Sequence, residues 1–477
     1  MLNNILPIDL QKVHMVGIGG IGMSSLAHLI LDCNGLVSGS DIKESCIINK
    51  LRSRGAKINI GHNASYLDLL PGGVSSVIIT KTAIPKNNPE LLEAQNRKIT
   101  ILFRPTVLAK LMMDCTAIVV AGTHGKTTTT AMLISVMRYC HFNPSFSIGG
   151  ELCSISNNAF YGSGKYFVTE VDESDGSLLE FNPNILIVTN IDVDHLDFFG
   201  NPQAYSQIFF DFVERIKPGG SLVVCTDSPG SALLADYADK SGIKVLRYGT
   251  LVNKYSHGLI LNFKHKGIFT VVYIKLAGNF CLHKIYLKMP NKCTALNALA
   301  VFLVAIGLGA PVDKITKGLM NFKGVQKRFE LIGIYDGIHV FNDYAHHPTE
   351  IKTTLESALI IAKQFNSKVI AIFQPHLYSR TANFATEFGN ALSNADRIFI
   401  LDIYGAREGP LPGVNSTSIA KGIVNPAAYI TYFPVVIHEV VTMANYGDII
   451  ITMGAGDVTL LGKEIFANLR KNRVKIM

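Results

Sequence analysis

The chain alternates short apolar runs with glycine-rich or polar turns and helical stretches from one end to the other. The run KVHMVGIGG at residues 12–20, for example, leads directly into the helical stretch GMSSLAHLILD. Parallel strands need a crossover between them, and that crossover is usually a helix. The alternation therefore predicts βαβ units on mainly parallel sheets, and the predicted fold class is α/β.

Length and motif order predict three domains. At about 150 residues per domain, a chain of 477 residues corresponds to about three. The first block, 1–113, ends after the helical stretch PTVLAKLMM, and the second, 114–324, begins with the strand CTAIVVAG. The third, 325–477, contains the predicted strands IHVFNDY, KVIAIFQP, RIFILDIY and DIIITMG.

Charge and cysteine content restrict the partners. The net charge is +8, yet the basic residues form no dense stripe of the kind that binds nucleic acid, and the local excess at 463–475 is expected to be a solvated helix end. This charge suits anionic small molecules.

The eight cysteines show neither metal-ligand pairing nor a disulfide framework. The longest apolar run, 298–312, is too short to span a bilayer, and no signal peptide is visible. We expect a cytoplasmic protein with no nucleic-acid or membrane partner.

A first glycine motif lies between a predicted strand and a helix. Gly17, Gly19 and Gly22 form GxGxxG, and Asp41 follows Gly22 by 19 residues at the end of the next strand. Glycines at this spacing let backbone amides approach a diphosphate at a helix N-terminus, and the acid can accept a ribose hydroxyl. Any nucleotide diphosphate fits this chemistry, so NAD is not implied. The alternative is a tight turn that binds no ligand.

A second motif, GTHGKTTTT from Gly122 to Thr130, follows a buried strand and opens a helix. It lacks the strict Walker spacing, because the first glycine of that pattern would fall at Val120. Gly122 and Gly125 nevertheless permit a nest of amides, Lys126 is positioned for β and γ phosphates, and Thr127 for Mg²⁺. The motif predicts a nucleoside triphosphate site.

Two more predicted strands of the central block end in acidic clusters. Since ligands of open α/β sheets lie outside the carboxyl ends of the strands, both clusters should share an edge with the phosphate loop. Carboxylates beside a triphosphate suggest Mg²⁺, and Glu170 and His195 are the favoured ligands because each lies just at a strand end. The other members are expected to be solvated loop charges or helix caps: Asp172, Glu173, Asp175, Asp192, Asp194 and Asp197.

The third block has comparable strand ends. DYAHHPTE and FQPHLYSRT each follow a predicted strand and together carry His346, His347, His376 and Arg380. Adjacent histidines on a loop cannot both be core residues, and Arg380 suits a carboxylate, which it can bind through two parallel hydrogen bonds. The alternatives are helix capping at Thr349 and a surface arginine.

In their order, the phosphate loop, TEVDESDGSLL, TNIDVDHLD, DYAHHPTE and FQPH-Y-RT resemble the motifs of the Mur ligases. GIGGIGMSSLA and GSD resemble the members that add L-alanine to UDP-N-acetylmuramate, and the resemblance covers essentially the whole chain. It implies an N-terminal Rossmann-like domain for the UDP-sugar, a central P-loop ATPase-type domain and a C-terminal Rossmann-like domain for the amino acid. The implied reaction converts the lactyl carboxylate to an acyl phosphate with ATP, and the amine of L-alanine then displaces phosphate.

The resemblance also implies roles for individual residues. Lys126, His195, His347 and Arg380 would be catalytic. Thr127, Glu170 and His195 would hold two Mg²⁺ ions, and Tyr344, His347, His376 and Arg380 would bind the amino acid. The UDP-sugar would contact Gly17, Gly19, Gly20, Gly22, Ser40 and Asp41. ATP would contact Gly122, Thr123, His124, Gly125, Lys126, Thr127, Thr128, Asn297, Arg328 and Asp343. The implied partners are UDP-N-acetylmuramate and L-alanine, and the implied assembly is a monomer or homodimer.

The chain departs from the family pattern in four places. A Gly-x-His-Asn segment usually precedes Asn297, but this chain reads NKCT at 291–294. A Thr hydroxyl at position 294 offers less to an adenine edge than an Asn amide, so we expect looser discrimination of ATP from GTP, unless the segment only caps a helix. Leu377 stands where an Arg is common, Asn342 where an Asp is usual, and Lys327 where one Arg of a pair is usual.

Three other functions are compatible with parts of the sequence. Within the family, a recycling ligase attaches a whole tripeptide to the same sugar nucleotide, although its glycine loop usually differs from GIGGIGM. A nicotinamide oxidoreductase would use the first glycine loop but not the phosphate loop or the acidic clusters. A nucleotide-dependent switch would use the phosphate loop but not the histidine and arginine clusters.

Overall fold

The computed structural model describes residues 6–81, 83–155, 157–192, 199–251, 255–266, 269–278, 281–406, 408–424, 428–430 and 432–474. These residues form three sheets and belong to two compact units. Among the described helices, none is both long and apolar enough to cross a membrane. One unit comprises Met1–Asn262, Tyr273–Ile285 and Ala295–Phe322, and the other comprises Phe263–Val272, Tyr286–Thr294 and Lys323–Met477.

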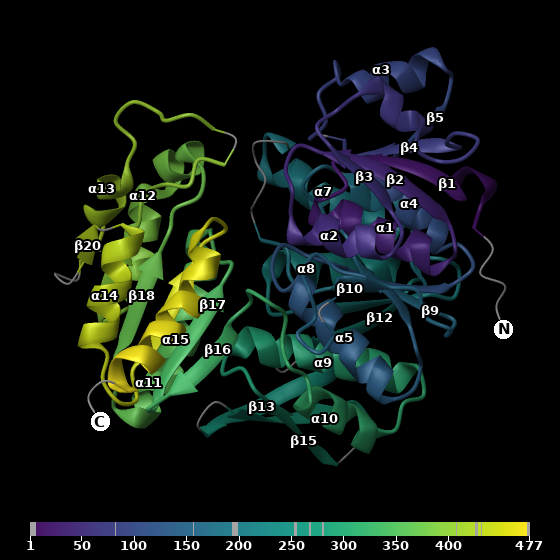
Figure 1. The fold of residues 1–477 in the computed structure, drawn as a ribbon. Coiled ribbons are helices and arrows are strands. Elements are labelled where there is room, and N and C mark those ends of the chain that lie inside the picture. The colour runs from purple at the N-terminus through teal and green to yellow at the C-terminus, as the bar shows by residue number, and fades with distance from the viewer. Residues whose placement is uncertain are drawn as a thin grey trace. The chain divides into compact units, whose positions relative to one another are not determined.

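The first sheet has five parallel strands in the order β3-β2-β1-β4-β5 (Figure 1). Chain order reverses between β1 and β4, and doubly wound folds bind ligands at such a point, outside the carboxyl ends of the strands. The elements are η1 (Ile8–Leu10), β1 (Lys12–Val16), α1 (Ile21–Asp32), β2 (Leu36–Asp41), α2 (Cys46–Ser53), β3 (Lys57–Ile60), η2 (Ala64–Asp68), β4 (Ser76–Ile79), α3 (Pro89–Asn96), β5 (Thr100–Phe103) and α4 (Arg104–Leu111).

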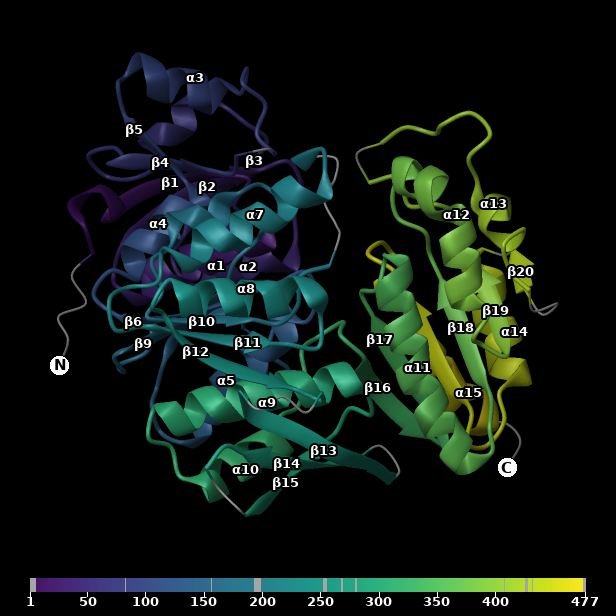
Figure 2. The same ribbon diagram turned by 180° about the vertical axis from the view of Figure 1, so that it is seen from behind.

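The second sheet has ten strands in the order β15-β14-β13-β12-β11-β10-β6-β9-β7-β8. In Figure 2, α7 and α8 lie on one side of strands β10 to β12, and α5 and α9 lie on the other. The strands of this sheet are β6 (Thr116–Ala121), β7 (Ser145–Ser147), β8 (Ala159–Phe160), β9 (Tyr166–Glu170), β10 (Ile185–Val188), β11 (Ser221–Cys225), β12 (Lys244–Gly249), β13 (Ser256–Lys266), β14 (Phe269–Leu276) and β15 (Leu282–Leu287). The helices of this part of the chain are α5 (Lys126–Tyr139), η3 (Ser177–Glu180), α7 (Pro202–Val213), α8 (Pro229–Lys240), α9 (Lys292–Gly307) and α10 (Val312–Met320).

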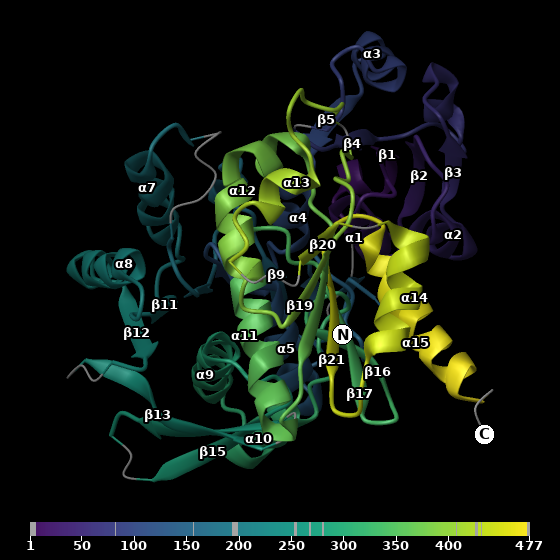
Figure 3. The ribbon, with the colours of Figure 1, turned by 90° about the vertical axis from the view of Figure 1, so that its left-hand side faces the viewer.

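The third sheet has six strands in the order β16-β17-β21-β18-β19-β20, of which β16 alone runs antiparallel to its neighbour within the described chain. Helices α11 and α12 cover one face, and α14 and α15 cover the other (Figure 3). The elements are β16 (Glu330–Tyr335), β17 (Ile338–Asp343), α11 (Pro348–Phe365), β18 (Val369–Phe373), α12 (Tyr378–Leu392), β19 (Arg397–Ile400), α13 (Ser416–Ala420), β20 (Ala428–Ile430), α14 (Phe433–Met443), β21 (Ile449–Met453) and α15 (Val458–Val474).

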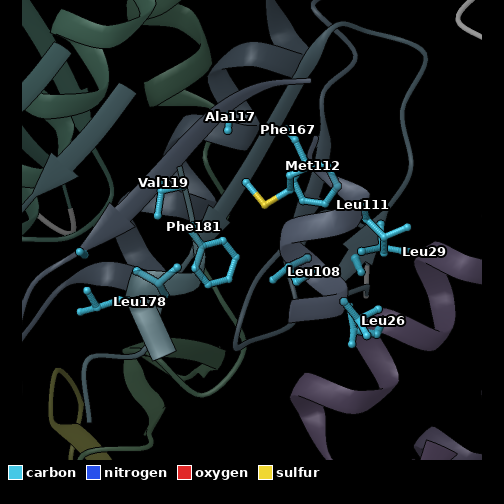
Figure 4. Packing of buried hydrophobic residues seen from close by; sticks show 14 of the residues in the cluster. Leu26, Leu29, Leu108, Leu111, Met112, Ala117, Val119, Phe167, Leu178 and Phe181 are labelled. Carbon is cyan, nitrogen blue, oxygen red and sulfur yellow. The ribbon is translucent and has the colours of Figure 1, made fainter. Parts of the chain in front are cut away.

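The first and second sheets share one hydrophobic core. Leu26 and Leu29 of α1 belong to the same buried cluster as Leu108 of α4 and Phe167 of β9. Figure 4 shows these side chains together with Phe181, which follows η3. Two polar contacts lie at the same junction: Ser147 Oγ donates to Ser25 Oγ at 3.0 Å, and Asn158 Nδ2 donates to the Ile21 carbonyl at 2.9 Å.

The predicted α/β fold is confirmed, and the strands expected near residues 12, 116, 166, 185, 338, 369, 397 and 449 are present. Their identification depended on continuous apolar runs, which the structure explains because parallel strands here are buried on both faces. The predicted boundaries at residues 113 and 324 stay predictions.

Candidate functional site

The first glycine loop follows β1 at the carboxyl edge of the first sheet. Gly17 has a positive φ of 74°, and the N–H groups of Gly17 and Ile18 donate to the Ser40 carbonyl at 2.9 and 3.0 Å. Gly20 is the N-cap of α1, so the unpaired N–H groups of its first turn lie beside the loop. The predicted residues Gly17, Gly19, Gly20, Gly22, Ser40 and Asp41 therefore meet at an edge suited to an anion.

Asp41 holds this loop directly. Its Oδ2 accepts a hydrogen bond from the Gly19 N–H at 2.8 Å, and a Cβ added to Gly19 would lie 2.8 Å from the same oxygen. Position 19 must therefore be glycine for the loop to close on Asp41. One carboxylate oxygen is engaged by the loop, and Oδ1 has a longer contact of 3.4 Å with the Lys43 N–H.

Arg104 lies beside the same loop, which the sequence analysis missed. A Cβ added to Gly22 would lie 3.0 Å from Arg104 Cδ and 3.2 Å from Arg104 Nη1. Arg104 is the first residue of α4 and is half-buried. The available signal was an arginine directly after a strand end, in the segment FRP. Its guanidinium adds a fixed positive charge next to the N-terminus of α1.

The phosphate loop is tightly bonded to the end of β10. A Cβ on Gly122 would clash with Thr189 Oγ1 and lie 2.8 Å from the Asn190 carbonyl, and Gly122 has a φ of 125°. The Thr123 N–H donates to the Asn190 carbonyl at 3.1 Å, and the His124 N–H donates to Asn190 Oδ1 at 2.9 Å. These bonds fix the loop in an open turn that ends at Gly125, the N-cap of α5.

Lys126 folds back over the loop and pairs with a buried acid. Its Nζ donates to the Gly122 carbonyl at 2.7 Å, to the Thr123 carbonyl at 3.2 Å and to Glu173 Oε1 at 2.8 Å. The Glu173 side chain is only 1% exposed. The expectation that Glu173 is a solvated loop charge or helix cap is therefore wrong, because its side chain is buried and paired with Lys126, which lies 47 residues earlier in the chain.

The first turn of α5 separates its four threonines into two pairs. The hydroxyls of Thr129 and Thr130 donate back to the carbonyls of Gly125 and Lys126 and are buried. Thr127 and Thr128 are half-buried at the helix N-terminus, and their roles toward ATP and Mg²⁺ stay predictions.

Asn297 of α9 lies against the same loop. A Cβ added to Gly125 would be 3.1 Å from both Asn297 Nδ2 and Asn297 Oδ1. The predicted contact of Asn297 with the triphosphate site is therefore compatible with its position.

Of the predicted metal ligands Glu170 and His195, the structure describes only Glu170. Glu170 ends β9, and its Oε1 accepts the Gly149 N–H at 2.5 Å. His195 lies outside the described residues, as do Asp194 and Asp197. Within the described ranges, no group of three His, Cys, Asp or Glu side chains could hold a metal ion.

Segment 291–294 caps a helix. Asn291 Oδ1 accepts the Thr294 N–H at 2.6 Å, and Asn291 Nδ2 donates to Ser357 Oγ at 2.9 Å. The Thr294 side chain is buried. This geometry agrees with the helix-cap alternative, while the adenine role of Thr294 stays a prediction.

In the third sheet, Asp343 at the end of β17 fastens the residue before β16 and the loop after β17. Its Oδ2 accepts the Phe329 N–H and its Oδ1 accepts the Ala345 N–H, both at 2.7 Å. Burial raises the pKa of Asp343 to about 6, although Arg328 and the two N–H groups act in the opposite direction. Arg328 also lies 3.5 Å from Glu350 and over the Tyr344 ring.

A cluster of aromatic and basic side chains lies at the carboxyl end of this sheet. The His346 ring lies 5.5 Å from Tyr344 and 6.0 Å from His376, and His376 stacks on Tyr404 at 5.9 Å. Burial, together with Arg380, lowers the pKa of His346. Arg380 Nη1 is buried and has no hydrogen-bond partner among the described residues.

His347, to which the sequence analysis assigned a catalytic role, packs against a different aromatic ring from those that its neighbour His346 contacts. It is the N-cap residue of α11, and its ring packs edge-on against Phe384 at 5.1 Å. Within this unit, His346 and Tyr404 join Tyr344, His376 and Arg380, and the sequence analysis assigned a role to neither. The sequence placed both histidines on the loop but held no signal for their directions.

Comparisons with known proteins identify related chains. Family models match at residues 12–115 (Mur ligase family, catalytic domain), 120–305 (Mur ligase middle domain) and 327–456 (Mur ligase, glutamate ligase domain). The chain is 55% identical over 465 residues to a UDP-N-acetylmuramate–L-alanine ligase of Mycolicibacterium smegmatis, covering 98% of this chain and 96% of that protein.

Two solved structures are similar over nearly the whole chain. A UDP-N-acetylmuramate-alanine ligase from Thermotoga maritima gives a TM-score of 0.79 at 27% identity, with 96% of this chain and 99% of that chain covered. A murein peptide ligase from Psychrobacter arcticus gives a TM-score of 0.68 at 23% identity, with 96% of this chain and 98% of that chain covered. The latter shows the fold alone.

Proposed function

The chain belongs to the Mur ligase family, and we propose that it joins L-alanine to the lactyl carboxylate of UDP-N-acetylmuramate with consumption of ATP, in peptidoglycan precursor synthesis. The observation that carries the proposal is the 55% identity, across 98% of the chain, to an enzyme named for this reaction. The geometry of the three predicted sites agrees with it.

In this reaction the γ phosphate of ATP passes to the lactyl carboxylate, which gives an acyl phosphate and ADP. The free amine of L-alanine then attacks the acyl carbon, and phosphate leaves from the tetrahedral intermediate. Both steps move negative charge between oxygens, so fixed cations and oriented N–H groups are the main aid that the protein can supply.

The phosphate loop supplies such groups. Its backbone is held open by Thr189 and Asn190, and Lys126 Nζ already lies over it. On triphosphate binding, phosphate oxygens would replace the loop carbonyls as acceptors for this ammonium. Glu173 would then keep the ammonium at the loop rather than in solvent.

Mg²⁺ would be bound beside the triphosphate through oxygen donors. Half-buried Thr127 at the N-terminus of α5 and the carboxylate of Glu170 at the end of β9 are of the chemical type that Mg²⁺ prefers, and His195 is the third proposed ligand. Two such ions, the number that the family resemblance implies, would neutralise charge on the transferring phosphoryl group. Residues 114–324 are the proposed ATP-binding domain.

The UDP-sugar would bind at the first sheet, in residues 1–113. The N-terminus of α1 and the Arg104 guanidinium provide positive charge for the diphosphate. Asp41 would accept a ribose hydroxyl while holding the loop through Gly19.

L-alanine would bind in residues 325–477. Arg380 has a buried nitrogen without a described partner, which suits a carboxylate. Tyr344, His346 and His376 line the same cluster, and a neutral His346 avoids repulsion of the incoming ammonium. We further propose a cytoplasmic monomer or homodimer.

The test is phosphate release by the purified chain with ATP, Mg²⁺ and UDP-N-acetylmuramate, offering L-alanine, glycine, L-serine or the L-alanyl-γ-D-glutamyl-diaminopimelate tripeptide in turn. We expect release with L-alanine and little with the tripeptide. Preference for the tripeptide would assign the recycling reaction instead. NADH oxidation, or hydrolysis that needs no second substrate, would support the oxidoreductase or switch.

A further inference from the structure

Beneath the first glycine loop lies a buried polar network that no step above uses. Its centre is Glu90, the second residue of α3, whose side chain is fully buried. Ser40 Oγ donates to Glu90 Oε2 at 2.6 Å, and His62 Nδ1 lies 3.2 Å from the same oxygen and 3.0 Å from Ser40 Oγ. Glu90 Oε1 is 3.4 Å from the Asn63 N–H.

The carboxylate of Glu90 is ionised in this setting. Burial alone raises the pKa of Glu90, but the neighbouring His14 imidazole and the hydrogen bond from Ser40 bring it below its usual value. His14, also fully buried, places Nε2 3.7 Å from Glu90 Oε2. An ionised carboxylate accepts hydrogen bonds and donates none.

These contacts determine where the proton of His62 lies. Ser40 has one hydroxyl proton, which is directed to Glu90. Nδ1 of His62 therefore faces two acceptors, the Ser40 oxygen and the Glu90 carboxylate, and must itself carry a proton. In the neutral ring, Nε2 is then an acceptor on the opposite side. The His62 side chain is 20% exposed, whereas Glu90 is inaccessible.

Ser40 links this network to the candidate sugar-nucleotide site. The Ser40 carbonyl accepts the N–H groups of Gly17 and Ile18, while its hydroxyl binds Glu90. His62 lies two residues after the end of β3 and Ser40 is the penultimate residue of β2, so both belong to the carboxyl edge of the parallel sheet. A partly exposed imidazole fixed at this edge is suited to accept a hydrogen bond from a donor on a bound nucleotide.

We propose that Glu90 is a positioning residue of the sugar-nucleotide site, which holds His62 as the Nδ1–H tautomer so that Nε2 accepts a hydrogen bond from the bound nucleoside diphosphate. This inference rests on the proposed function, because it assumes a UDP-sugar at the first sheet. Carboxylate–imidazole pairs orient histidines in the same way at other ligand sites. Glu90 acts only through His62 and touches no substrate.

The experiment is isothermal titration of UDP into the full chain and its variants. Glu90→Gln keeps the size of the side chain but replaces one acceptor oxygen with a donor. We expect the Kd for UDP to rise about fivefold to tenfold in Glu90→Gln and by a similar factor in His62→Ala. The double variant should bind like His62→Ala alone, within about twofold, because the two residues act as one unit. Glu93→Gln, an exposed acid on the same helix, is the matched control.

The outcomes separate the two hypotheses. No binding of UDP or UDP-N-acetylmuramate by the wild type would overturn the proposed function itself. Wild-type binding that Glu90→Gln leaves unchanged would overturn only the role of Glu90. An equal loss with and without His62 would show that Glu90 is structural.

A spectroscopic measurement gives an independent readout. In ¹⁵N-histidine-labelled chain, the His62 signals, assigned by their loss in His62→Ala, should show protonated Nδ1 and unprotonated Nε2. If Glu90→Gln does not fold, as judged by ADP titration, Ser40→Ala is measured instead. It leaves the Glu90 charge in place, so His62 should keep the Nδ1–H tautomer. A His62 with protonated Nε2 in the wild type would refute the proposal.

Discussion

The ammonium of Lys126 lies 2.8 Å from both carboxylate oxygens of Glu173, whose side chain is buried, while the same Nζ donates to two carbonyls of the phosphate loop. The cation that we propose for the transferring phosphoryl group is therefore paired with a buried carboxylate in this structure.

Lys126→Ala is expected to reduce phosphate release by about a hundredfold or more, because one preorganised cation is lost at the transferring group. Binding of UDP-N-acetylmuramate should remain within about twofold of the wild type, since the first glycine loop lies on another sheet. Enzyme assay and calorimetry measure the two effects separately. A collapse of sugar-nucleotide binding would contradict the assignment of the two loops.

The same variant leaves Glu173 buried without its cation. Its melting temperature should therefore fall, and adding Glu173→Gln to Lys126→Ala should recover part of the loss, about 1 to 3 kcal/mol. No recovery in the double variant would mean that Glu173 is solvated once Lys126 is gone.

Arg104→Ala should weaken UDP binding about tenfold, which corresponds to the loss of one charge-assisted hydrogen bond. Arg97→Ala is the matched control, because Arg97 belongs to the same sheet region but pairs on the surface with Asp68 and Glu93. The loss should diminish at high salt. Equal Kd values for the two variants would remove Arg104 from the diphosphate site.

Arg380→Lys should raise the KM for L-alanine several-fold and leave the KM values for ATP and the sugar nucleotide nearly unchanged. Lysine offers a point charge where a carboxylate needs a planar pair of donors. Arg397→Lys, at the opposite end of the sheet, serves as control. An alanine KM within about twofold of the wild type, less than ~0.5 kcal/mol, would exclude Arg380 from the amino-acid site.

Asn291→Ala should lower the free energy of unfolding by about 1 kcal/mol, because it removes the side-chain acceptor for the Thr294 N–H. Asn291→Ser should retain most of this stability. Chemical unfolding of the three proteins measures the difference. If the alanine variant instead keeps its stability and loses selectivity for ATP over GTP, residues 291–294 contact the adenine base.

Asp343 should make the chain less stable as pH rises through the acidic range. Its folded-state pKa of about 6 exceeds the usual 3.8, so the folded chain binds the proton more tightly. The stability advantage of wild type over Asp343→Asn should therefore shrink between about pH 4 and pH 7, by at most about 3 kcal/mol. Urea unfolding at several pH values tests this. An advantage that grows with pH would mean that ionised Asp343 is favoured in the fold.

Much of the fold was predictable because its signal is local. Fully buried parallel strands require continuous apolar runs, and strand ends followed by glycine mark turns. Gly122 illustrates this: its φ of 125° and the proximity of Thr189 and Asn190 leave no room for a side chain.

The features of the site that could not be predicted depend on where side chains point, whereas the sequence indicates only where residues lie along the chain. His346 and His347 are neighbours in sequence, yet one ring joins the Tyr344 cluster and the other packs on Phe384. Glu173 and Arg104 owe their contacts to elements distant in sequence, from 47 to 82 residues away. No local pattern encodes such contacts.

The core shared by α1, α4, β6 and β9 limits how this protein can be divided. Leu108, Leu111 and Met112 bury their apolar surface against residues of the second sheet as well as the first. A protease cut or an engineered break after Met113 would expose this surface on both fragments, so neither fragment is expected to remain monomeric in isolation. Exchange of the first α/β block between related enzymes would accordingly require the facing side chains of β6, β9 and η3 to be transplanted with it.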